Sequence, residues 1–301
     1  LQSQTSDYKT IVPLLEKWGR ENGVKVNITG FPAATFVQSW ISGWEAGSDT
    51  FDFVQGGPIA TFVDNGYVIP LDGAYDPEIR WPQELTDDFF PGVLDMATYR
   101  GKIYVAFYST DANPFFYRKD LFSEAGFDRP PEDLEELVEY GKKLTVDFDG
   151  DGIVDRYGFG WWLKPQTNSC AMWFYNLLHS NGGQLINDNG ELVFDSPEGV
   201  ASLQFMYDLL HTYKISPEAS LAWFQNEQFQ AARNDQIAMW QSGAWTYASL
   251  NNEDDSPIKG KVGVAKFPKG AVKSATLLGG NGFLIARTGK NKHNAWKAIQ
   301  Y

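Results

Sequence analysis

The sequence predicts an α/β fold made of largely parallel sheets with helices on both faces. Helical and strand patterns alternate at the start of the chain, and this α-β-α-β-α order is typical of that class. The chain has 301 residues, of which 43% are hydrophobic and 21% charged, and a chain of that size can bury ample core. Its length suits two domains or one large one.

The first elements each have a local signature. Apolar residues recur at helical spacing from Ile11 to Trp18, and Gly23 ends that helix. VKVNI then alternates like a strand, and FDFV is a short apolar strand before a Gly-Gly-Pro turn. The expected elements are helix 7–22, strand 24–28, helix 35–46, strand 51–54 and helix 59–65.

The later elements follow the same rules. Ser196 followed by Pro197 is a typical helix start, because serine caps the first turn and proline suits its first position. Pro130 and Pro131 open another helix whose first turns are acidic, as the helix dipole favours. The remaining expected elements are strands 102–107, 115–117, 236–240, 262–266 and 282–286, helices 170–180, 196–213 and 225–233, and a final helix from Asn294.

The charge of the chain limits the classes of partner that we expect. With 38 acidic and 25 basic residues, its net charge is -13. An acidic protein repels phosphate backbones and anionic lipid, so we expect neither nucleic acid nor a membrane surface as a direct partner. There is no run of 18 apolar residues, so no membrane-spanning helix is predicted.

Catalytic signatures are missing from the sequence. The single cysteine, Cys170, allows no disulfide within the chain and is expected to be a small buried residue. His179, His211 and His293 lie far apart, and none of the HExxH, GxSxG, P-loop or GxGxxG motifs occurs. We therefore predict a protein that is not an enzyme. The alternative is a glycosidase, because acidic and aromatic residues are abundant.

The aromatic content is unusually high. The chain contains 11 Trp, 14 Tyr and 21 Phe residues, together 15% of the sequence. Tryptophan usually packs in cores, but it also stacks on the apolar faces of sugar rings. In an acidic, cysteine-poor chain, this composition favours carbohydrate binding.

Several segments, in their order along the chain, resemble the extracellular solute-binding proteins of ABC importers. The similarity is to family 1, the sugar-binding family that includes maltose-binding protein, and it runs along the whole chain. The crossover segment FFYRKDLFSEAGFDRPPEDLEELVEYGKKLT, residues 115–145, is the most specific. The others are GVKV (23–26), GSDTFDFV (47–54), FVDNGYVIPLD (62–72), IAMWQSGAWTYASL (237–250) and GGNGFLIA (279–286).

The resemblance implies a two-lobed periplasmic-binding-protein-like fold of type II, with a ligand cleft between the lobes. Each lobe would be a mostly parallel sheet flanked by helices, and the lobes would close by a hinge motion. The expected N-terminal lobe is 1–109 with 262–301, the crossover is 110–118, and the C-terminal lobe is 119–261. A doubly wound domain normally opens with a strand. We therefore expect a fragment that lacks its first strand and its C-terminal helices.

The same resemblance implies an extracytoplasmic monomer that captures a neutral sugar or oligosaccharide and delivers it to an ABC permease. No cofactor would be required. A polyamine, a phosphate ester or a metal complex is the alternative ligand on the same fold.

Two residues are the foremost ligand-binding candidates. Asp111 lies six residues before Tyr117, where the family carries a sugar-contacting acid, and Trp245 follows Ser-Gly-Ala, where the family presents a tryptophan. A turn cap and core packing are their respective structural alternatives. The further candidates are Asn113, the expected turn Gly279, Gly280 and Asn281, Gln55 and Gly56 after the strand FDFV, and Trp40, Trp44, Trp161, Trp162 and Trp173.

The stretch DFDGDGIVDRYGFGWW, residues 147–162, has the pattern of a calcium loop. The predicted ligands are Asp147, Asp149, Asp151, the carbonyl of Ile153, and Asp155. Position 12 of such a loop needs a glutamate, and here it is Gly158. Structural Ca²⁺ and an Asp/Gly turn held by its own backbone both remain open. Similar loops in the family favour a structural role.

Overall fold

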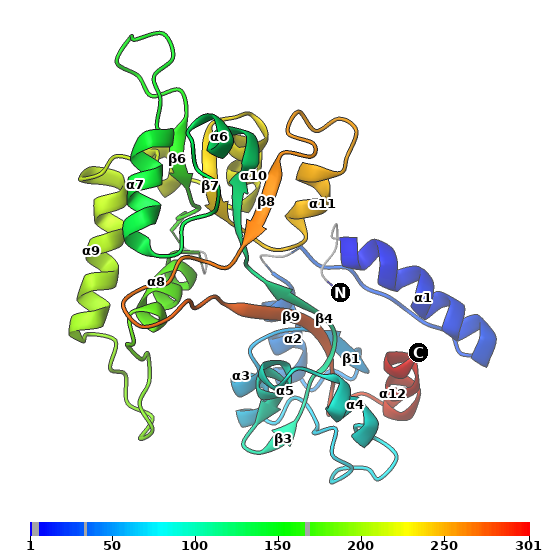
Figure 1. Cartoon of the computed structure of the whole chain (residues 1–301). Helices are drawn as coiled ribbons and strands as arrows, with labels where there is room; N and C mark the ends of the chain where they lie inside the picture. Colours follow the sequence, from blue (N-terminus) through cyan, green and yellow to red (C-terminus); the bar gives the residue numbers. More distant parts are fainter. Residues whose placement is uncertain (2–5, 33–34, 166–168) are drawn as a thin grey trace. The chain divides into compact units, whose positions relative to one another are not determined.

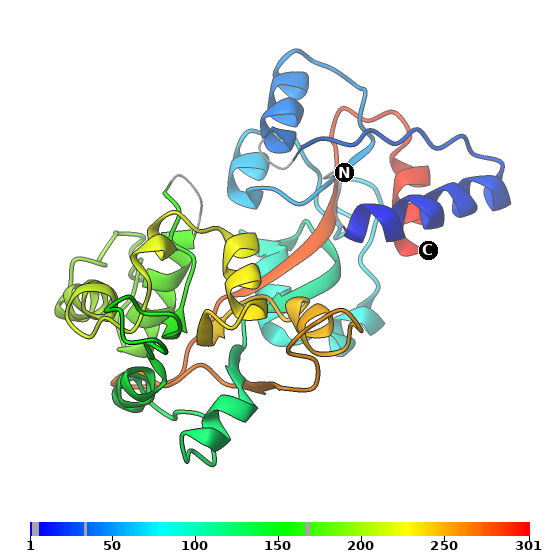
Figure 2. The same ribbon diagram turned by 90° about the horizontal axis from the view of Figure 1, so that it is seen from above.

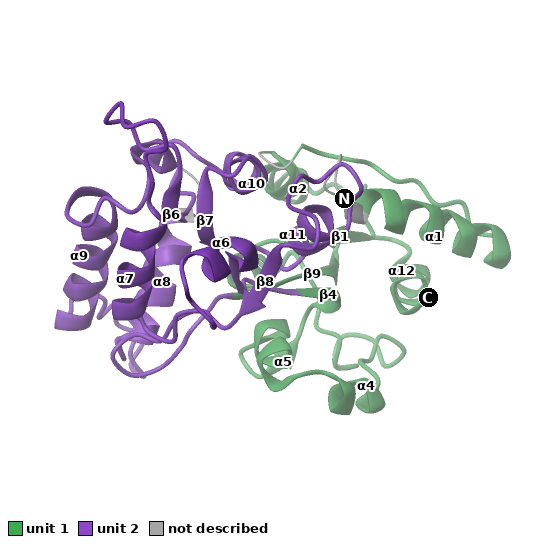
Figure 3. Cartoon of the chain, turned by 45° about the horizontal axis from the view of Figure 1, so that its top comes forward, with its two compact units in different colours: residues 1–110, 278–301 green, residues 111–277 purple. Residues whose placement is uncertain are grey.

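The chain divides into two compact units, each with its own sheet and helices (Figure 3). The computed structural model describes residues 1, 6–32, 35–165 and 169–301. Unit 1 comprises residues 1–110 and 278–301, and unit 2 comprises residues 111–277. The return to unit 1 comes later than the predicted position, 262, because β8 (Val262–Ala265) pairs with β5 (Phe115–Arg118) inside unit 2.

Unit 1 contains the three-stranded sheet β1-β9-β4 and the small hairpin β2-β3 (Figure 1). Its strands are β1 (Phe53–Gln55), β2 (Thr98–Tyr99), β3 (Lys102–Ile103), β4 (Ala106–Ala112) and β9 (Leu278–Ile285), and the last two residues of β4 already belong to unit 2. Its helices are α1 (Ser6–Asn22), α2 (Phe36–Glu45), α3 (Ile59–Asp64), α4 (Gln83–Asp88), α5 (Pro91–Ala97) and α12 (Lys292–Gln300).

The core of unit 1 lies on both faces of this sheet. Successive side chains of a strand point to opposite faces. Val54 accordingly packs with Trp40 and Phe62 of α2 and α3, whereas Phe53 packs toward Leu15 of α1. Leu284 and Ile285 of β9 divide in the same way, between the α2–α3 cluster and the cluster that contains Trp296 of α12. The sheet is therefore buried on both sides.

The segment 24–28 is extended but is not a strand, contrary to the prediction. After α1 the chain runs back toward α2 without regular structure (Figure 2). The N–H of Val24 donates to the carbonyl of Gly19, and a side chain at Gly19 would lie 2.6 Å from Val24 O. The segment is thus packed on α1, with Val26 and Ile28 partly buried. The alternation is real, but no neighbouring strand in the described chain pairs with it.

Unit 2 contains the four-stranded sheet β6-β7-β5-β8. Besides β5 and β8, its strands are β6 (Tyr157–Gly160) and β7 (Ile237–Gln241). Its α-helices are α6 (Lys119–Glu124), α7 (Leu134–Leu144), α8 (Ser169–Ser180), α9 (Pro197–His211), α10 (Gln225–Arg233) and α11 (Thr246–Asn251), and Glu218–Leu221 forms a 3₁₀ turn.

Neighbouring residues of β5 and β7 separate the two cores of unit 2. Phe115 and Met239 pack with α7, α8 and α9, while Phe116 and Trp240 pack with α10 and α11. Figure 1 shows α7, α8 and α9 gathered on one side of this sheet. Both faces are covered, as the almost uniformly apolar sequence of β7 predicts.

Strand directions are mixed, although the sheets were expected to be mostly parallel. Among the strand pairs with a described register in the two large sheets, β6–β7 is parallel, whereas β1–β9, β5–β7 and β5–β8 are antiparallel. The chain enters β5 and β9 where it passes from one unit to the other, without a crossover helix that would impose a parallel direction. The α/β class holds, with this difference in sheet topology.

The predicted and observed helices agree best where the helix ends carry capping residues. The carboxylate of Asp133 accepts from the N–H of Glu136 at the start of α7, and Ser196 accepts from Gly199 N at the start of α9. Helices α4, α5, α6 and α11 were not predicted, because six or seven residues give too little periodicity. Within the described residues, every helix is too short or too polar to cross a membrane.

Candidate functional site

Asp111 and Trp245, the two foremost candidates, lie next to each other in unit 2. Asp111 is the penultimate residue of β4, and its Oδ1 accepts a hydrogen bond of 3.0 Å from the N–H of Ala244. The same N–H also lies 3.0 Å from the carbonyl of Ala112. These bonds hold the loop between β7 and α11 against the end of β4.

Gly243 allows the close approach of the two side chains. The first carbon of a side chain at this position would lie 2.4 Å from Trp245 Nε1 and 2.8 Å from Asp111 Oδ2. Both polar atoms therefore flank the same glycine. Trp245 is 53% exposed, unlike most tryptophans of this chain. The arrangement offers an aromatic face beside a carboxylate oxygen.

The carboxylate of Asp111 has an unusual environment for an acid. Burial raises its pKa, and the hydrogen bond from the Ala244 amide opposes this increase to a lesser extent. Its second oxygen, Oδ2, accepts no hydrogen bond from the residues that the structure describes. A partly desolvated oxygen without a donor is suited to accept one from a ligand hydroxyl.

Asn113 lies in the interior. It is 6% exposed, and its Nδ2 is 3.8 Å from the sulfur of Met172. Its backbone carbonyl accepts from Gln241 Nε2 at 2.7 Å and from Thr276 Oγ1 at 2.8 Å. The structure therefore gives Asn113 a role in holding the crossover segment, not an exposed position for a ligand.

Gln241, which sequence reasoning missed, is the centre of this buried network. It is fully buried, donates to Asn113 O and Thr276 Oγ1, and accepts from Asn176 Nδ2. The signal in the sequence was a single polar residue at the end of the apolar run IAMW. A glutamine in a buried strand needs partners for both amide atoms.

Replacing Gln241 by leucine should lower the free energy of unfolding by about 2–4 kcal/mol, because the buried amide of Asn176 loses its acceptor and other groups of the network lose a partner. Chemical denaturation followed by circular dichroism measures this change. Gln204→Leu on the exposed face of α9 is the matched control and should change stability little. Equal effects of the two substitutions would remove Gln241 from this role.

Gln55 and Gly56 stand at the carboxyl end of β1 in unit 1. Gln55 is 4% exposed, and its Nε2 donates to the hydroxyl of Tyr108 at 2.6 Å. Gly56 has a φ of 66°, a left-handed conformation that favours glycine, and its N–H donates to Gly282 O. The pair shapes the end of the strand, and Tyr108 is exposed beside it.

Gly279, Gly280 and Asn281 are not a turn, contrary to the prediction. They belong to β9, which begins at Leu278 and is hydrogen-bonded to β4. A side chain at Gly280 would lie 2.8 Å from Ser109 O and 2.9 Å from the ring of Phe107, so the strand needs glycine there. Gly280 and Asn281 are exposed on unit 1.

The other candidate tryptophans lie in the cores of the two units in this structure, which agrees with core packing as the alternative to ligand contact. Trp40 and Trp44 are 1% and 5% exposed within the core of unit 1. Those of unit 2 are similarly covered: Trp161, Trp162 and Trp173 are 0%, 2% and 1% exposed. Trp173 packs edge-on against Phe159 and Trp161. Burial of rings this large is the ordinary use of tryptophan.

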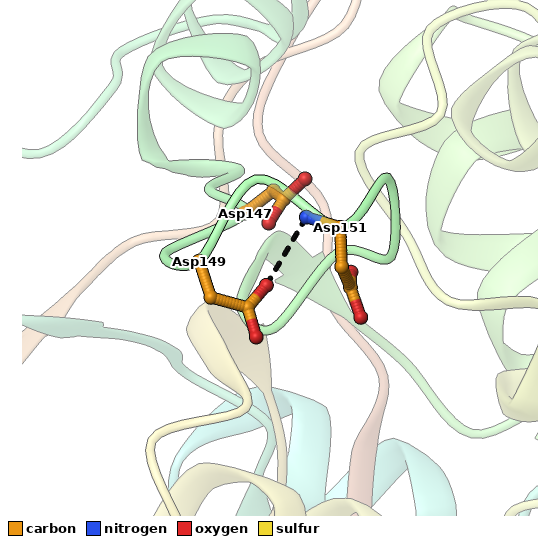
Figure 4. A group of neighbouring side chains, drawn as sticks. All are labelled: Asp147, Asp149 and Asp151. Atoms are coloured by element: carbon orange, nitrogen blue, oxygen red, sulfur yellow. Dashed lines mark hydrogen bonds between the residues drawn. The ribbon is translucent and has the colours of Figure 1, made fainter.

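The aspartate loop is stabilised by its own backbone. The two oxygens of Asp147 accept from Gly150 N at 2.7 Å and Gly152 N at 2.9 Å, which lowers the pKa of Asp147. Asp149 accepts from Asp151 N (Figure 4), and Asp151 accepts from Ile153 N. These are successive Asx turns.

The predicted calcium ligands come together only in part. One oxygen each of Asp147, Asp149 and Asp151 lies within 4.8 Å of the others. Asp155 instead accepts from Phe148 N at 2.6 Å, which closes the loop at its base. Ile153 is exposed, and its backbone N–H is bonded to Asp151. These hydrogen bonds agree with the alternative of an Asp/Gly turn held by its own backbone, and calcium binding stays untested.

We expect calcium to leave the stability of the protein unchanged, because the carboxylates already bond the loop's own N–H groups. The measurement is a thermal denaturation with millimolar CaCl2 against the same protein in a chelator. An increase in Tm with calcium, abolished by Asp149→Asn, would show that the loop binds the ion.

Two further residues differ from expectation. Cys170 is exposed, not buried, and its Sγ donates to the carbonyl of Leu163. His293 lies between two carboxylates, 3.0 Å from Asp76 and 3.1 Å from Glu78, although its sequence neighbours gave no sign of this. Neither residue lies among the site candidates.

The sequence model of the family described as bacterial extracellular solute-binding proteins matches residues 2–301. The chain therefore belongs to this family of substrate-binding proteins, as its motifs predicted.

Named relatives share the family at modest identity. A probable ABC transporter-binding protein of Deinococcus radiodurans is 28% identical over 225 residues, which cover 70% of this chain and 50% of the relative. An arabinooligosaccharide-binding protein of Halalkalibacterium halodurans is 23% identical over 260 residues, or 83% and 51% of the two chains. This chain thus spans about half the length of these curated relatives.

Solved structures confirm the two-lobed α/β fold class. Maltose-bound MalE3 of T. maritima superposes with a TM-score of 0.81 at 27% identity, covering 99% of this chain and 74% of that one. A solute-binding protein of Thermotoga lettingae bound with alpha-D-tagatose gives a TM-score of 0.80 at 27% identity, with coverages of 97% and 72%.

Proposed function

We propose that the protein is the extracytoplasmic substrate-binding component of an ABC importer and that it captures a neutral sugar or oligosaccharide for delivery to the permease. Units 1 and 2 would be the two lobes, and the protein would act as a monomer. Closure of the lobes on the ligand remains a prediction. The family membership supports the class, and the residues of the site support the ligand.

The observation that carries the proposal is the pair formed by Asp111 and Trp245. A sugar presents hydroxyl donors at its rim and apolar C–H groups on its ring faces, so its site needs an acceptor beside an aromatic ring. Asp111 Oδ2 and the half-exposed indole of Trp245 supply both around one glycine. We propose that the carboxylate accepts a sugar hydroxyl while the indole stacks on the ring.

The charges near this pair favour a neutral ligand. Among the residues that the structure describes, no cationic side chain contributes to the shift in the pKa of Asp111. A phosphate or carboxylate ligand would need Arg or Lys and would be repelled by Asp111. The names of relatives support a neutral ligand, since they include arabinooligosaccharide-binding and mannitol-binding proteins. A polyamine is the alternative ligand, because the carboxylate of Asp111 would also attract a cation.

A thermal-shift panel tests the ligand class. Maltose, D-tagatose, mannitol and arabino-oligosaccharides form the neutral arm, spermidine the cationic arm, and glucose phosphate the anionic arm. Ligand that binds the native state raises Tm. We expect a shift in the neutral arm only. A shift with spermidine or glucose phosphate and none with the sugars would contradict the proposal.

Sugar binding should weaken as the pH falls. Because burial raises the pKa of Asp111, this loss should begin at a higher pH than it would for an aspartate with an ordinary pKa. Below that pKa the acid is protonated, and the charge-assisted hydrogen bond is lost. Affinity measured by calorimetry from pH 7 downward checks this. Asp111→Asn should bind more weakly at pH 7 and lose this pH dependence.

The same pKa shift predicts the effect of this variant on stability. Because the folded-state pKa lies above the unfolded value, ionised Asp111 lowers the stability of the native protein at neutral pH. Asp111→Asn should therefore be at least as stable as the parent. A large loss of stability in this variant would instead assign Asp111 a structural role.

The protein is proposed to bind without catalysis. The family to which the chain belongs is described as solute-binding proteins. Incubation with labelled oligosaccharides tests the point, because a binder returns them intact. Repeated turnover that is lost in Asp111→Asn would identify a glycosidase.

A further inference from the structure

Phe224, which immediately precedes α10 in unit 2, is an exposed aromatic residue outside the pair formed by Asp111 and Trp245. It is 37% exposed. Its N–H donates to Glu227 Oε2 at 2.9 Å, which fixes its backbone at the start of the helix. Its ring packs at 86° against the ring of buried Trp162, with 5.3 Å between the centroids. The ring is therefore held in one orientation while part of it stays open to solvent.

Gln228 fixes the start of α10 at the ends of two strands. This side chain is fully buried, and its Nε2 donates to Gly160 O at 3.0 Å and to Gln241 O at 3.1 Å. Gly160 and Gln241 are the last residues of β6 and β7, which are parallel and so end at the same edge of the sheet. The carbonyl of Phe224 accepts from the N–H of Gln228, one helical turn later. Phe224 therefore lies at this edge.

Trp245 lies at the same edge of the sheet. It follows β7 by four residues and immediately precedes α11. The N–H of its neighbour Ala244 donates to the carbonyl of Ala112, just before β5, and β5 is antiparallel to β7. Helices α10 and α11 pack on the same face of the sheet. Phe224 and Trp245 thus begin two helices on one face, where the strands have their carboxyl ends and open α/β sheets bind ligands.

The two aromatic residues stand on opposite sides of the end of β7. The order of the strands in this part of the sheet is β6-β7-β5. Phe224 contacts Trp162, which follows β6, whereas the loop of Trp245 is bonded to the segment before β5. Neighbouring strands are about 4.8 Å apart, so the outer two of these three are separated by roughly 10 Å. Two linked sugar rings can extend over that separation, and a single ring is too small to do so.

We propose that Phe224 is a second aromatic platform for the ligand, and that the site takes an oligosaccharide of at least two linked rings. One ring would lie at Asp111 and Trp245, and a neighbouring ring would stack on Phe224. This inference rests on the proposed function, because both rings belong to the same site. An aromatic face attracts the apolar C–H face of any neutral sugar. Phe224 should therefore add affinity for a longer ligand without selecting one kind of sugar.

Sugars of increasing length test the proposal. The probes for titration calorimetry are glucose, maltose and maltotriose, and arabinose, arabinobiose and arabinotriose. In one of these series the parent should bind the longer members about tenfold more tightly than the single sugar. Phe224→Leu keeps apolar packing against Trp162 but removes the aromatic face. It should lose the gain with length and bind the single sugar as the parent does, while Phe224→Tyr should resemble the parent throughout.

Phe194→Leu is the matched control. Phe194 is 41% exposed and also packs at 86° against a neighbouring ring, that of Phe174 in α8. Helix α8 packs on the other face of the sheet from α10 and α11. This substitution should leave the affinity for sugars of every length unchanged. Thermal denaturation checks that each variant is folded, and Phe224→Met replaces Phe224→Leu if the latter is not.

The outcomes separate this inference from the proposed function. A parent that binds sugars, together with a Phe224→Leu variant of unchanged affinity at every length, would overturn the inference and leave the proposed function in place. An equal loss for the single sugar and the longer ones would also overturn it, because Phe224 would then contact the same ring as Trp245. A parent that binds no sugar of any length would contradict the proposed function, and this inference with it.

Discussion

Trp245→Ala should weaken the binding of a neutral sugar by about ten- to seventyfold. Stacking removes roughly 60–100 Å² of ring face from water, which at about 25 cal/mol per Å² is worth roughly 1.5–2.5 kcal/mol, and each 1.4 kcal/mol is about tenfold in Kd. Because Trp245 is 53% exposed, its loss removes little of the core. Titration calorimetry gives the affinity, and thermal denaturation should show an unchanged Tm.

Trp245→Phe is the matched variant, because it keeps an aromatic face and removes the indole nitrogen. We expect it to retain most of the affinity. If Trp245→Ala binds as the parent does, Trp245 does not contact the sugar. If its Tm falls by many degrees, the residue is structural.

Trp173→Ala should have the opposite signature, with a loss of about 3–5 kcal/mol in the free energy of unfolding, as expected when a buried tryptophan is truncated. Trp173 is 1% exposed, and its ring lies 5.9 Å from Phe159 and 5.7 Å from Trp161. Urea denaturation measures the loss. The fraction that stays folded should bind sugar with the affinity of the parent.

Trp173→Phe should cost less, since the indole N–H is buried without a partner among the described residues. Trp173→Phe therefore loses ring volume but no hydrogen bond. A variant in which Trp173→Ala keeps its stability but loses sugar binding would restore this residue to the list of ligand contacts.

The sequence was most informative where local chemistry decides the structure. Capped and strongly periodic segments such as α7 and α9 were predicted correctly, because their signals lie within a few residues of each helix end. Residues 24–28 were wrongly predicted to be a strand. Their alternating pattern indicates an extended chain, but it does not show whether a neighbouring strand is present to pair with. The same limit explains Gly279 to Asn281, where glycine serves close packing against β4 and not a turn.

For the site, the resemblance named Asp111 and Trp245 as ligand-binding candidates, and the structure places both beside Gly243 although they are far apart in the chain. Ligand binding by these two residues stays a prediction. Composition and periodicity did not separate Trp245 from the buried tryptophans, because burial depends on the whole unit; only the resemblance of its Ser-Gly-Ala segment to the family set it apart. Gln241 was missed for the same reason, since its partners Asn113, Asn176 and Thr276 are brought together only by the fold.

The most direct test of the proposed function is a calorimetric titration of the parent protein and of the double variant Asp111→Asn, Trp245→Ala with the neutral sugar that gives the largest thermal shift. Our account predicts that the parent binds one sugar per chain and that the double variant gives no measurable heat while keeping the Tm of the parent. Sugar binding of equal affinity by the folded double variant would contradict it.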